Sequence, residues 1–316
     1  TKRGTVMMIL QVLLLLVGFL LLVKGADWFV EGAASIAKKM GIPQLIVGLT
    51  IVAMGTSMPE AAVSITAAIN GNAGITVGNV VGSNIMNILI ILGITSVITS
   101  VAIQKSTLYY EIPFMIGITV VMMIFGYTDS KITFFESVIL CILFVAFLGY
   151  LFYMAKKGSP TEEETAKDFP VWKCLLLMVI GGIMVVKGSD FAVDGASYIA
   201  KFFGMSDRFI GLTIVAFGTS LPELVTSITA AKKGNVGIAI GNIVGSNIFN
   251  ILFVIGITGL ICDVPFESKF LIDTCVAIGA GIILWLGTIK HKELRRPCGI
   301  LMLLCYAGYF AYLCVK

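Results

Sequence analysis

Residues 48–60 read GLTIVAMGTSMPE, and residues 211–223 repeat them as GLTIVAFGTSLPE. Each copy ends in a glutamate that directly follows a proline, within a segment of mostly apolar and small residues. A charged side chain at membrane depth costs about 2.5–3.5 kcal/mol on insertion scales, and such residues usually serve a function. The duplicated Pro-Glu pair therefore gives the first candidate site residues, Glu60 and Glu223.

The remainder of the chain is apolar enough to lie in a bilayer. It is 58% hydrophobic and 13% charged, with a mean hydropathy of +1.01, whereas a soluble domain is about one quarter charged. Stretches close to the ~20 residues that one crossing needs recur along the chain, for example 6–23, 108–125, 132–153, 172–186 and 299–315. We predict an all-α integral membrane protein of about ten transmembrane helices.

Several function classes do not fit this composition. The cations are dispersed, so we expect no nucleic-acid partner, and the seven cysteines lack the spacing of a metal site or disulfide framework. The single histidine, His291, lies in a charged loop far from both motifs, which leaves no base for an intramembrane hydrolase. We therefore expect no enzyme and no cofactor. The bilayer is the expected surrounding, no obligatory protein partner is evident, and a passive Ca²⁺ channel stays open as an alternative.

The repeat extends well beyond the motif. Residues 48–94 align without a gap with the stretch 163 positions later. We predict two five-helix units, 1–155 and 171–316, joined by a polar linker over 156–170. Because five is odd, the second unit must enter the membrane from the opposite side, so the repeats are inverted and their broken motif helices meet at the midplane. Lys and Arg are more frequent in the loops on the linker side, which predicts a multi-pass cell-membrane protein with a cytoplasmic linker and extracellular termini.

The motif residues offer oxygen atoms to a cation. Pro59 and Pro222 should break or kink their helices, and backbone freed at membrane depth is tolerated only where it lines a cavity or a site. About six to eight oxygen ligands suit Ca²⁺. The oxygens that we expect to converge are the carboxylates of Glu60 and Glu223, the hydroxyls of Thr56, Ser57, Thr219 and Ser220, and the carbonyls of Ala53, Thr56, Ala216 and Thr219.

A second duplicated motif can add to the same centre. Residues 78–87 read GNVVGSNIMN, and residues 241–250 read GNIVGSNIFN. In each copy three polar residues lie four apart and share one helix face, namely Asn79, Ser83 and Asn87 in the first and Asn242, Ser246 and Asn250 in the second. For the first asparagine of each set, a structural role is as open as an ion-binding one.

Other polar residues near the motifs are expected to have structural roles. Ser64 and Ser227 should bond the backbone of their own helix. Asn84 and Asn247 lie about 100° from the polar face of their helices and should pack or cap.

At these motifs the chain resembles the sodium/calcium exchanger family, of prokaryotic type, within the cation/calcium exchanger superfamily. The resemblance covers nearly the whole chain and implies ten helices in two inverted halves, Na⁺ and Ca²⁺ competing for a midplane site, and alternating access as one bundle slides past another. The residues that it places around the ions are Glu60 and Glu223 with the carbonyls of Thr56 and Thr219 for Ca²⁺; Ser57, Ser246 and the carbonyl of Ala53 for one Na⁺; Ser220, Ser83 and the carbonyl of Ala216 for its symmetry mate; and Asn87 and Asn250 at the centre.

Charge alone indicates how such a site would work. Two facing carboxylates repel each other at low dielectric, and either one divalent cation or several Na⁺ would neutralise them. We therefore expect electrogenic antiport, with Na⁺ entry driving Ca²⁺ out. The alternative is H⁺/Ca²⁺ antiport, although proton-coupled relatives commonly carry a Glu in the second motif, where this chain has only Asn and Ser. Relatives that also transport K⁺ have Asp at the place of Asn250, so we expect no K⁺ requirement.

Overall fold

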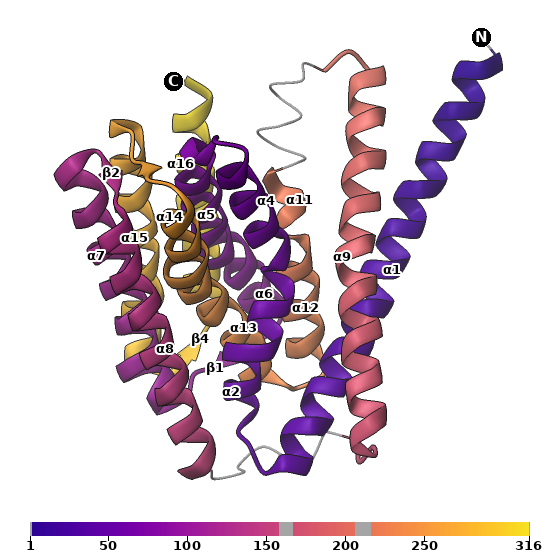
Figure 1. The fold of residues 1–316 in the computed structure, drawn as a ribbon. Coiled ribbons are helices and arrows are strands. Elements are labelled where there is room, and N and C mark those ends of the chain that lie inside the picture. Colours follow the sequence, from indigo (N-terminus) through magenta and orange to yellow (C-terminus); the bar gives the residue numbers. More distant parts are fainter. Residues whose placement is uncertain (1, 158–166, 206–215, 316) are drawn as a thin grey trace.

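The computed structural model describes residues 2–157, 167–205 and 216–315 of the chain, and these are almost entirely helical (Figure 1). The first half contains α1 (Lys2–Met40), α2 (Gln44–Val47), η1 (Gly48–Val52), α3 (Ala53–Thr56), α4 (Met58–Ile69), η2 (Ala73–Ile75), α5 (Thr76–Met86), η3 (Asn87–Leu92), α6 (Gly93–Ile98), β1 (Val101–Ala102), η4 (Thr107–Glu111), α7 (Ile112–Asp129), β2 (Lys131–Ile132) and α8 (Phe134–Lys157). The second half contains α9 (Val171–Phe202), α11 (Ala216–Thr219), α12 (Leu221–Lys232), α13 (Val236–Phe249), η6 (Asn250–Ile255), α14 (Gly256–Ile261), β3 (Val264–Pro265), α15 (Ser268–Ile289), β4 (Glu293–Leu294) and α16 (Arg296–Val315).

The membrane-spanning segments agree with the expected class. Among the described residues, eight helices are long and apolar enough to cross a bilayer, and a ninth crossing results if the bent pair Gln44–Thr56 and Met58–Ile69 counts as one span. The counterpart of that pair is α11 with α12. Residues 206–215 precede this pair and lie outside the described residues. They include residues 211–215, the start of the second copy of the first motif. The count is therefore roughly consistent with ten. Most of the predicted linker, 158–166, also lies outside the described part of the chain.

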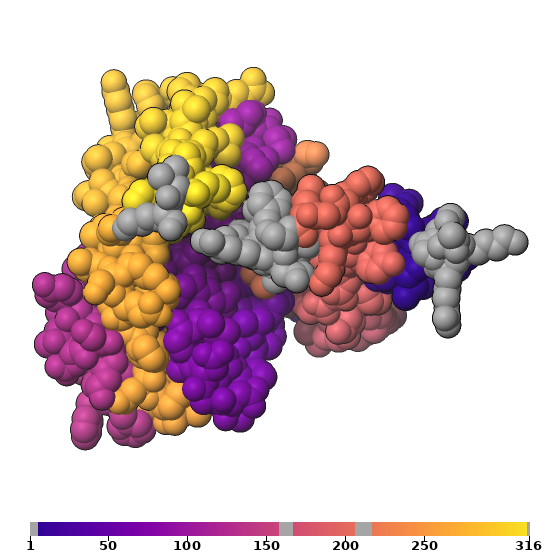
Figure 2. Space-filling model, turned by 90° about the horizontal axis from the view of Figure 1, so that it is seen from above, coloured from indigo at the N-terminus to yellow at the C-terminus, as the bar shows by residue number. Residues whose placement is uncertain are grey.

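The two halves are inverted, because their first helices run antiparallel. A Cβ added at Gly18 of α1 would lie 2.6 Å from the amide nitrogen of Ala192 in α9, while one at Gly32 would lie 2.7 Å from the carbonyl of Cys174. Moving forward along α1 thus means moving backward along α9. Small residues allow this close backbone approach. In Figure 2 the α1–α9 pair projects from one side of the remaining bundle.

The same two-fold relation recurs in two short antiparallel sheets. β1 pairs with β4, and β2 pairs with β3, so each sheet takes one strand from each half. The two sheets lie at opposite ends of the bundle (Figure 1). The described ends of the chain lie at one end of the bundle, and the C-terminus of α8 lies at the other (Figure 1).

The second-motif helices form the centre of the protein. In the most apolar stretch of each span, 94% of the residues are buried for Val236–Ile261 and 72% for Ala73–Ile98. The corresponding share in α1 is 11%. Polar side chains within a membrane face the protein interior rather than lipid, and α5 and α13 each carry asparagine and serine side chains. The second motif is therefore held in the interior, where its asparagines can act only on other protein groups or on bound ions.

Candidate functional site: a buried pair of carboxylates

Both motif helices break two residues before the proline. Ser57 leaves the helical region (φ −84°, ψ 8°) between α3 and α4, and the axis bends there by 49°. Ser220 does the same (φ −91°, ψ 2°) between α11 and α12. The proline then occupies the first turn of the new helix, where a missing N–H costs nothing. This break places Glu60 and Glu223 in the first turn of α4 and α12, where the positive end of the helix dipole favours a carboxylate.

Local winding changes also mark the motifs. The helix is a π-helix at Gly48–Val52, Asn87–Leu92 and Asn250–Ile255. Such wider turns are rare and are frequently found at functional sites. The two described π-segments that begin at Asn87 and Asn250 start at the last polar residue of each second motif, so the winding changes where the site begins.

The two carboxylates are buried near each other in the interior. Glu60 is 1% exposed and Glu223 is fully buried. The Ser57 hydroxyl of the first half donates to Oε1 of Glu223 in the second half at 2.8 Å. The Ser83 hydroxyl donates to Oε1 of Glu60 at 3.5 Å, and Ser220 is buried beside the same carboxylate. The serine of each broken helix thus lies at the glutamate of the other half.

The carbonyl of Ala53 accepts hydrogen bonds from the protein, whereas the sequence predicted that the helix break would free it. It accepts the amide of Ser57 at 3.0 Å and the hydroxyl of Ser246 at 3.4 Å, so the helix break does not free it, because the chain closes a last turn before it bends. These contacts do gather Ser57, Ser246 and the Ala53 carbonyl at one point. In the second half the amide of Ser220 bonds the carbonyl of Phe217 instead, at 3.2 Å. No described contact places the carbonyl of Ala216, and Thr219 is half-buried.

The first asparagine of each second motif braces two helices. Asn79 Nδ2 donates to the Ser64 hydroxyl at 2.9 Å and to the carbonyl of Glu60 at 3.2 Å. Its counterpart Asn242 donates to the Ser227 hydroxyl at 2.9 Å and to the carbonyl of Glu223 at 3.4 Å.

These contacts correct two expectations. Ser64 and Ser227 serve as acceptors for the neighbouring helix and do not simply bond their own backbone, because the α4–α5 and α12–α13 packing brings a donor to each. The Thr56 hydroxyl donates to Asn242 Oδ1 at 2.9 Å, so this hydroxyl is committed to protein rather than free for an ion. The bracing contacts of Asn79 and Asn242 favour a structural role for these two residues.

Four asparagines join the two halves at the two-fold axis. Asn84 Nδ2 donates to the carbonyl of Asn247 at 3.1 Å, and Asn247 Nδ2 donates to the carbonyl of Asn84 at 3.2 Å. Asn87 Nδ2 donates to Asn247 Oδ1 at 2.9 Å, and Asn250 Nδ2 donates to Asn84 Oδ1 at 3.0 Å. The sequence predicted only packing or capping for Asn84 and Asn247. Their spacing of three from Asn87 and Asn250 was the available signal for a shared network.

Among the carboxylate and amide groups of the two duplicated motifs, four buried oxygens have no hydrogen-bond donor, and they form two symmetry-related pairs. They are Oε2 of Glu60, Oε2 of Glu223, Oδ1 of Asn87 and Oδ1 of Asn250. No described ion pair reaches either glutamate. Burying an acceptor without a donor costs free energy. A bound cation would satisfy these four oxygens and would also balance the two negative charges. The atoms are all oxygen, which suits hard cations such as Ca²⁺.

Inverted repeats whose helices break beside buried carboxylates, within an apolar bundle, are typical of membrane ion transporters. The family profile described as sodium/calcium exchanger protein matches residues 10–153 and 173–315. The sodium/calcium exchanger MaX1 of Methanosarcina acetivorans is 31% identical over 97% of this chain and 99% of its own length. The inner membrane protein YrbG of Escherichia coli is 37% identical over 93% of this chain and 94% of its own.

Solved structures agree with these sequence matches. A structure of the sodium-calcium exchanger NCX_Mj, soaked with zero Na⁺ and Ca²⁺, aligns with a TM-score of 0.85 and 35% identity, over 96% of this chain and 99% of that chain. The chain therefore belongs to the sodium/calcium exchanger family. It is a multi-pass membrane antiporter of the cation/Ca²⁺ class and not an enzyme, and exchangers of this family transport their ions without a cofactor.

Proposed function

We propose that this protein exchanges Na⁺ for Ca²⁺ electrogenically, with Na⁺ entry driving Ca²⁺ out of the cell. The observation that carries the proposal is the set of four donor-free oxygens on Glu60, Glu223, Asn87 and Asn250. The names of MaX1 and NCX_Mj as sodium/calcium exchangers support the choice of ions.

The charge of this site explains why the two ions would exclude each other. Two buried carboxylates carry a charge of −2 if both are ionised, and one Ca²⁺ cancels it. Several Na⁺ in adjacent oxygen sites can do the same. An empty site leaves uncompensated charge in a low-dielectric interior, which costs several kcal/mol per ion. Movement of the empty protein between its two states is then disfavoured, so ion flow in one direction requires flow in the other.

We assign the proposed ligands as follows. Glu60 and Glu223 hold Ca²⁺ together with the carbonyls of Thr56 and Thr219. One Na⁺ site uses Ser57, Ser246 and the Ala53 carbonyl, which lie together around that carbonyl. Its mate uses Ser83 and Ser220, which lie at Glu60, with the carbonyl of Ala216. Ser57 also donates to Glu223, so a Na⁺ on Ser57 lies next to the Ca²⁺ ligand and competes directly with Ca²⁺.

The moving part that we propose is the α1–α9 pair. It projects from the bundle (Figure 2), and the contacts of Gly18, Gly25, Gly181 and Gly188 hold α1 and α9 together as one body. We further propose that the halves 1–155 and 171–316 act as the two symmetric units, joined by the linker 156–170. The linker would face the cytoplasm, with both termini outside.

Transport in reconstituted vesicles tests the ion coupling. Proteoliposomes loaded with Na⁺ and diluted into Na⁺-free buffer with Ca²⁺ should accumulate Ca²⁺, and a valinomycin-imposed membrane potential should change the rate, because net charge moves. A pH gradient without Na⁺ should drive no uptake. Uptake that follows the pH gradient and ignores Na⁺ would instead establish H⁺/Ca²⁺ antiport. Ca²⁺ flux without any counter-ion would indicate a channel.

A further inference from the structure

A third membrane-embedded acid lies in the outer helices, apart from the proposed ion site. Glu111 ends η4 at the start of the α7 span and is 1% exposed. The hydroxyl of Tyr150 in α8 donates to its Oε1 at 2.5 Å. Its other oxygen, Oε2, is closed to solvent and has no hydrogen-bond partner. The proposed exchange reaction does not use this residue, so its burial calls for a separate explanation.

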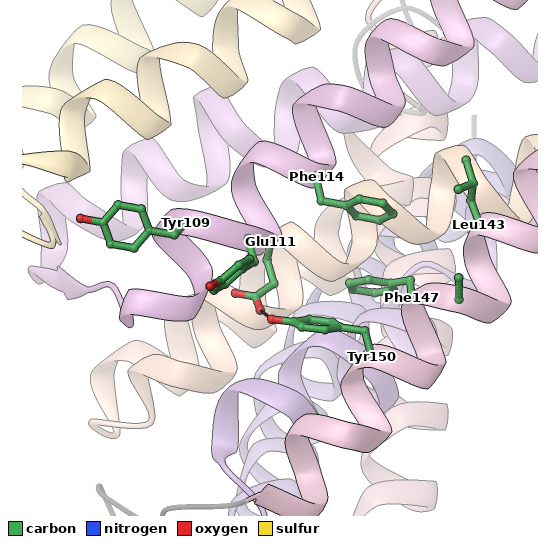
Figure 3. A pocket seen from close by; sticks show the side chains of 8 residues that line it. Tyr109, Glu111, Phe114, Leu143, Phe147 and Tyr150 are labelled. Carbon is green, nitrogen blue, oxygen red and sulfur yellow. Dashed lines mark hydrogen bonds between the residues drawn. The ribbon is translucent and has the colours of Figure 1, made fainter.

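Glu111 lines a cavity of about 330 Å³ with aromatic walls (Figure 3). Such a volume is within the range of small-ligand pockets, which starts at about 300 Å³. The rings of Phe114 and Phe147 stack with centroids 5.4 Å apart, and Phe147 stacks on Tyr150 at 6.4 Å. Figure 3 shows the carboxylate of Glu111 beside the Tyr150 hydroxyl at one end of this aromatic group. The cavity wall is therefore mainly aromatic and aliphatic, and its polar groups are tyrosine hydroxyls and one acid.

The cavity opens on the outer side of the bundle, where lipid would lie. The helices α7 and α8 form one edge of the molecule (Figure 1), and Tyr110 at the cavity is 64% exposed. On α8, Tyr150 lies two turns before Lys157, whose Nζ lies over the Tyr153 ring at 6.0 Å. Tyrosine and lysine at a helix end mark the headgroup level of a bilayer. The cavity thus lies just inside that level, within reach of a lipid headgroup.

The chemistry of the cavity selects an ammonium group. Aromatic faces attract cations, and the combination of several rings is the usual site for organic ammonium ions. One carboxylate with no second acid among the lining residues is a poor site for a metal ion. In the present arrangement Oε2 of Glu111 is closed to solvent, so the side chain must turn toward the cavity to meet a ligand. A primary ammonium can then donate an N–H to it, whereas a quaternary one cannot.

We propose that this cavity binds the primary-ammonium headgroup of a membrane lipid, such as phosphatidylethanolamine, with Glu111 as its counter-ion. The acyl chains would then lie along the exposed apolar side chains of α8, including Ile142 and Val145, which are 61% and 67% exposed. The bound lipid neutralises a carboxylate that would otherwise be unpaired at the membrane edge.

Native mass spectrometry of the purified full-length chain tests the proposal. The protein is mixed with equal amounts of phosphatidylethanolamine, phosphatidylcholine and phosphatidylglycerol that share the same acyl chains. We expect retention of phosphatidylethanolamine at about tenfold over phosphatidylglycerol, since the ion pair and the cation–π contacts are both lost with the anionic lipid. Glu111→Gln should remove this preference. Asp273→Asn is the matched control, because Asp273 also accepts a tyrosine hydroxyl, that of Tyr309 at 2.8 Å, in the outer helices.

The other outcomes are equally informative. Equal retention of the three lipids by the unmodified protein overturns the proposal without any variant. Retention of phosphatidylcholine as strong as that of phosphatidylethanolamine overturns the role of the primary ammonium. Displacement of the lipid by millimolar ethanolamine shows a site for a free amine instead. Tyr150→Phe keeps the acid and the aromatic ring and should keep the lipid preference. Loss of the preference in that variant would show that the acid does not hold the headgroup, and this would overturn the role assigned to Glu111.

Discussion

Neutralising one of the two buried carboxylates is the most direct perturbation of the proposed site. In Glu223→Gln the shape is kept, but the site charge changes from −2 to −1, so a bound Ca²⁺ leaves one uncompensated positive charge. Breaking a buried charge pair costs about 3–5 kcal/mol, and each 1.4 kcal/mol is a factor of ten. We therefore expect Ca²⁺ affinity to fall by about two to four orders of magnitude. Glu60→Gln should behave in the same way, because the two-fold relation makes the carboxylates equivalent.

The assay combines Ca²⁺ uptake into vesicles with thermal unfolding of the purified protein. Ligand that binds only the folded state raises the melting temperature, so Ca²⁺ should stabilise the unmodified protein and leave Glu223→Gln unchanged. Without ions, the variant should be at least as stable as the parent, since a buried carboxylate oxygen with no donor has been removed. Glu267→Gln is the control, because this exposed residue pairs only with Lys269 among the described contacts. Ca²⁺ uptake and Ca²⁺-induced stabilisation within threefold of the parent in either variant would refute the reasoning.

The remaining predictions concern other parts of the molecule. Asn84→Ala should lower the unfolding free energy by about 2–3 kcal/mol, because it leaves the Nδ2 of Asn250 without its partner in the interior, and chemical or thermal unfolding would measure this. Gly18→Val should block Na⁺-driven Ca²⁺ uptake, since even a Cβ would lie 2.6 Å from the backbone of α9, and an unchanged rate would contradict the role of the α1–α9 pair. Asn250→Asp adds a third carboxylate, so Ca²⁺ should bind more tightly and leave more slowly, as uptake at limiting and saturating Ca²⁺ would show. Transport by the unmodified protein should be the same with and without K⁺, and a strict K⁺ requirement would be inconsistent with asparagine at both central positions.

Much of the site could be found from the sequence because its signals are local. The copies at 48–60 and 211–223 are recognisable as strings of letters, and a glutamate next to a proline in an apolar segment is a rare combination. The Asn-x-x-x-Ser spacing of the second motif follows from helical geometry in the same way. These features sufficed to predict the membrane class, the inversion and the two acids.

Hydrogen-bond partners that lie across the two-fold axis could not be predicted from spacing in the sequence. Sequence spacing relates Ser57 to Glu60 and Asn84 to Asn87, all within one half. In the structure Ser57 bonds Glu223, and Asn84 bonds Asn247 and Asn250, because the halves interleave at their broken helices. The exchange of partners depends on how closely α3, α5, α11 and α13 approach, which no local pattern records. For the same reason the cavity at Glu111 was not anticipated, since it needs Tyr150 from the next helix.

The sequence by itself determined that this chain spans a membrane, that it is built twice, and that each copy brings one acid, because composition, repetition and residue type are properties of the string. The tertiary structure decided which oxygens remain without a donor. That depends on which hydrogen bonds form within the folded protein. Asn79 and Asn242 donate to neighbouring helices, whereas Oε2 of Glu60 and Oε2 of Glu223 have no donor. Only folding leaves these acceptors unpaired, and a cation can bind where they remain.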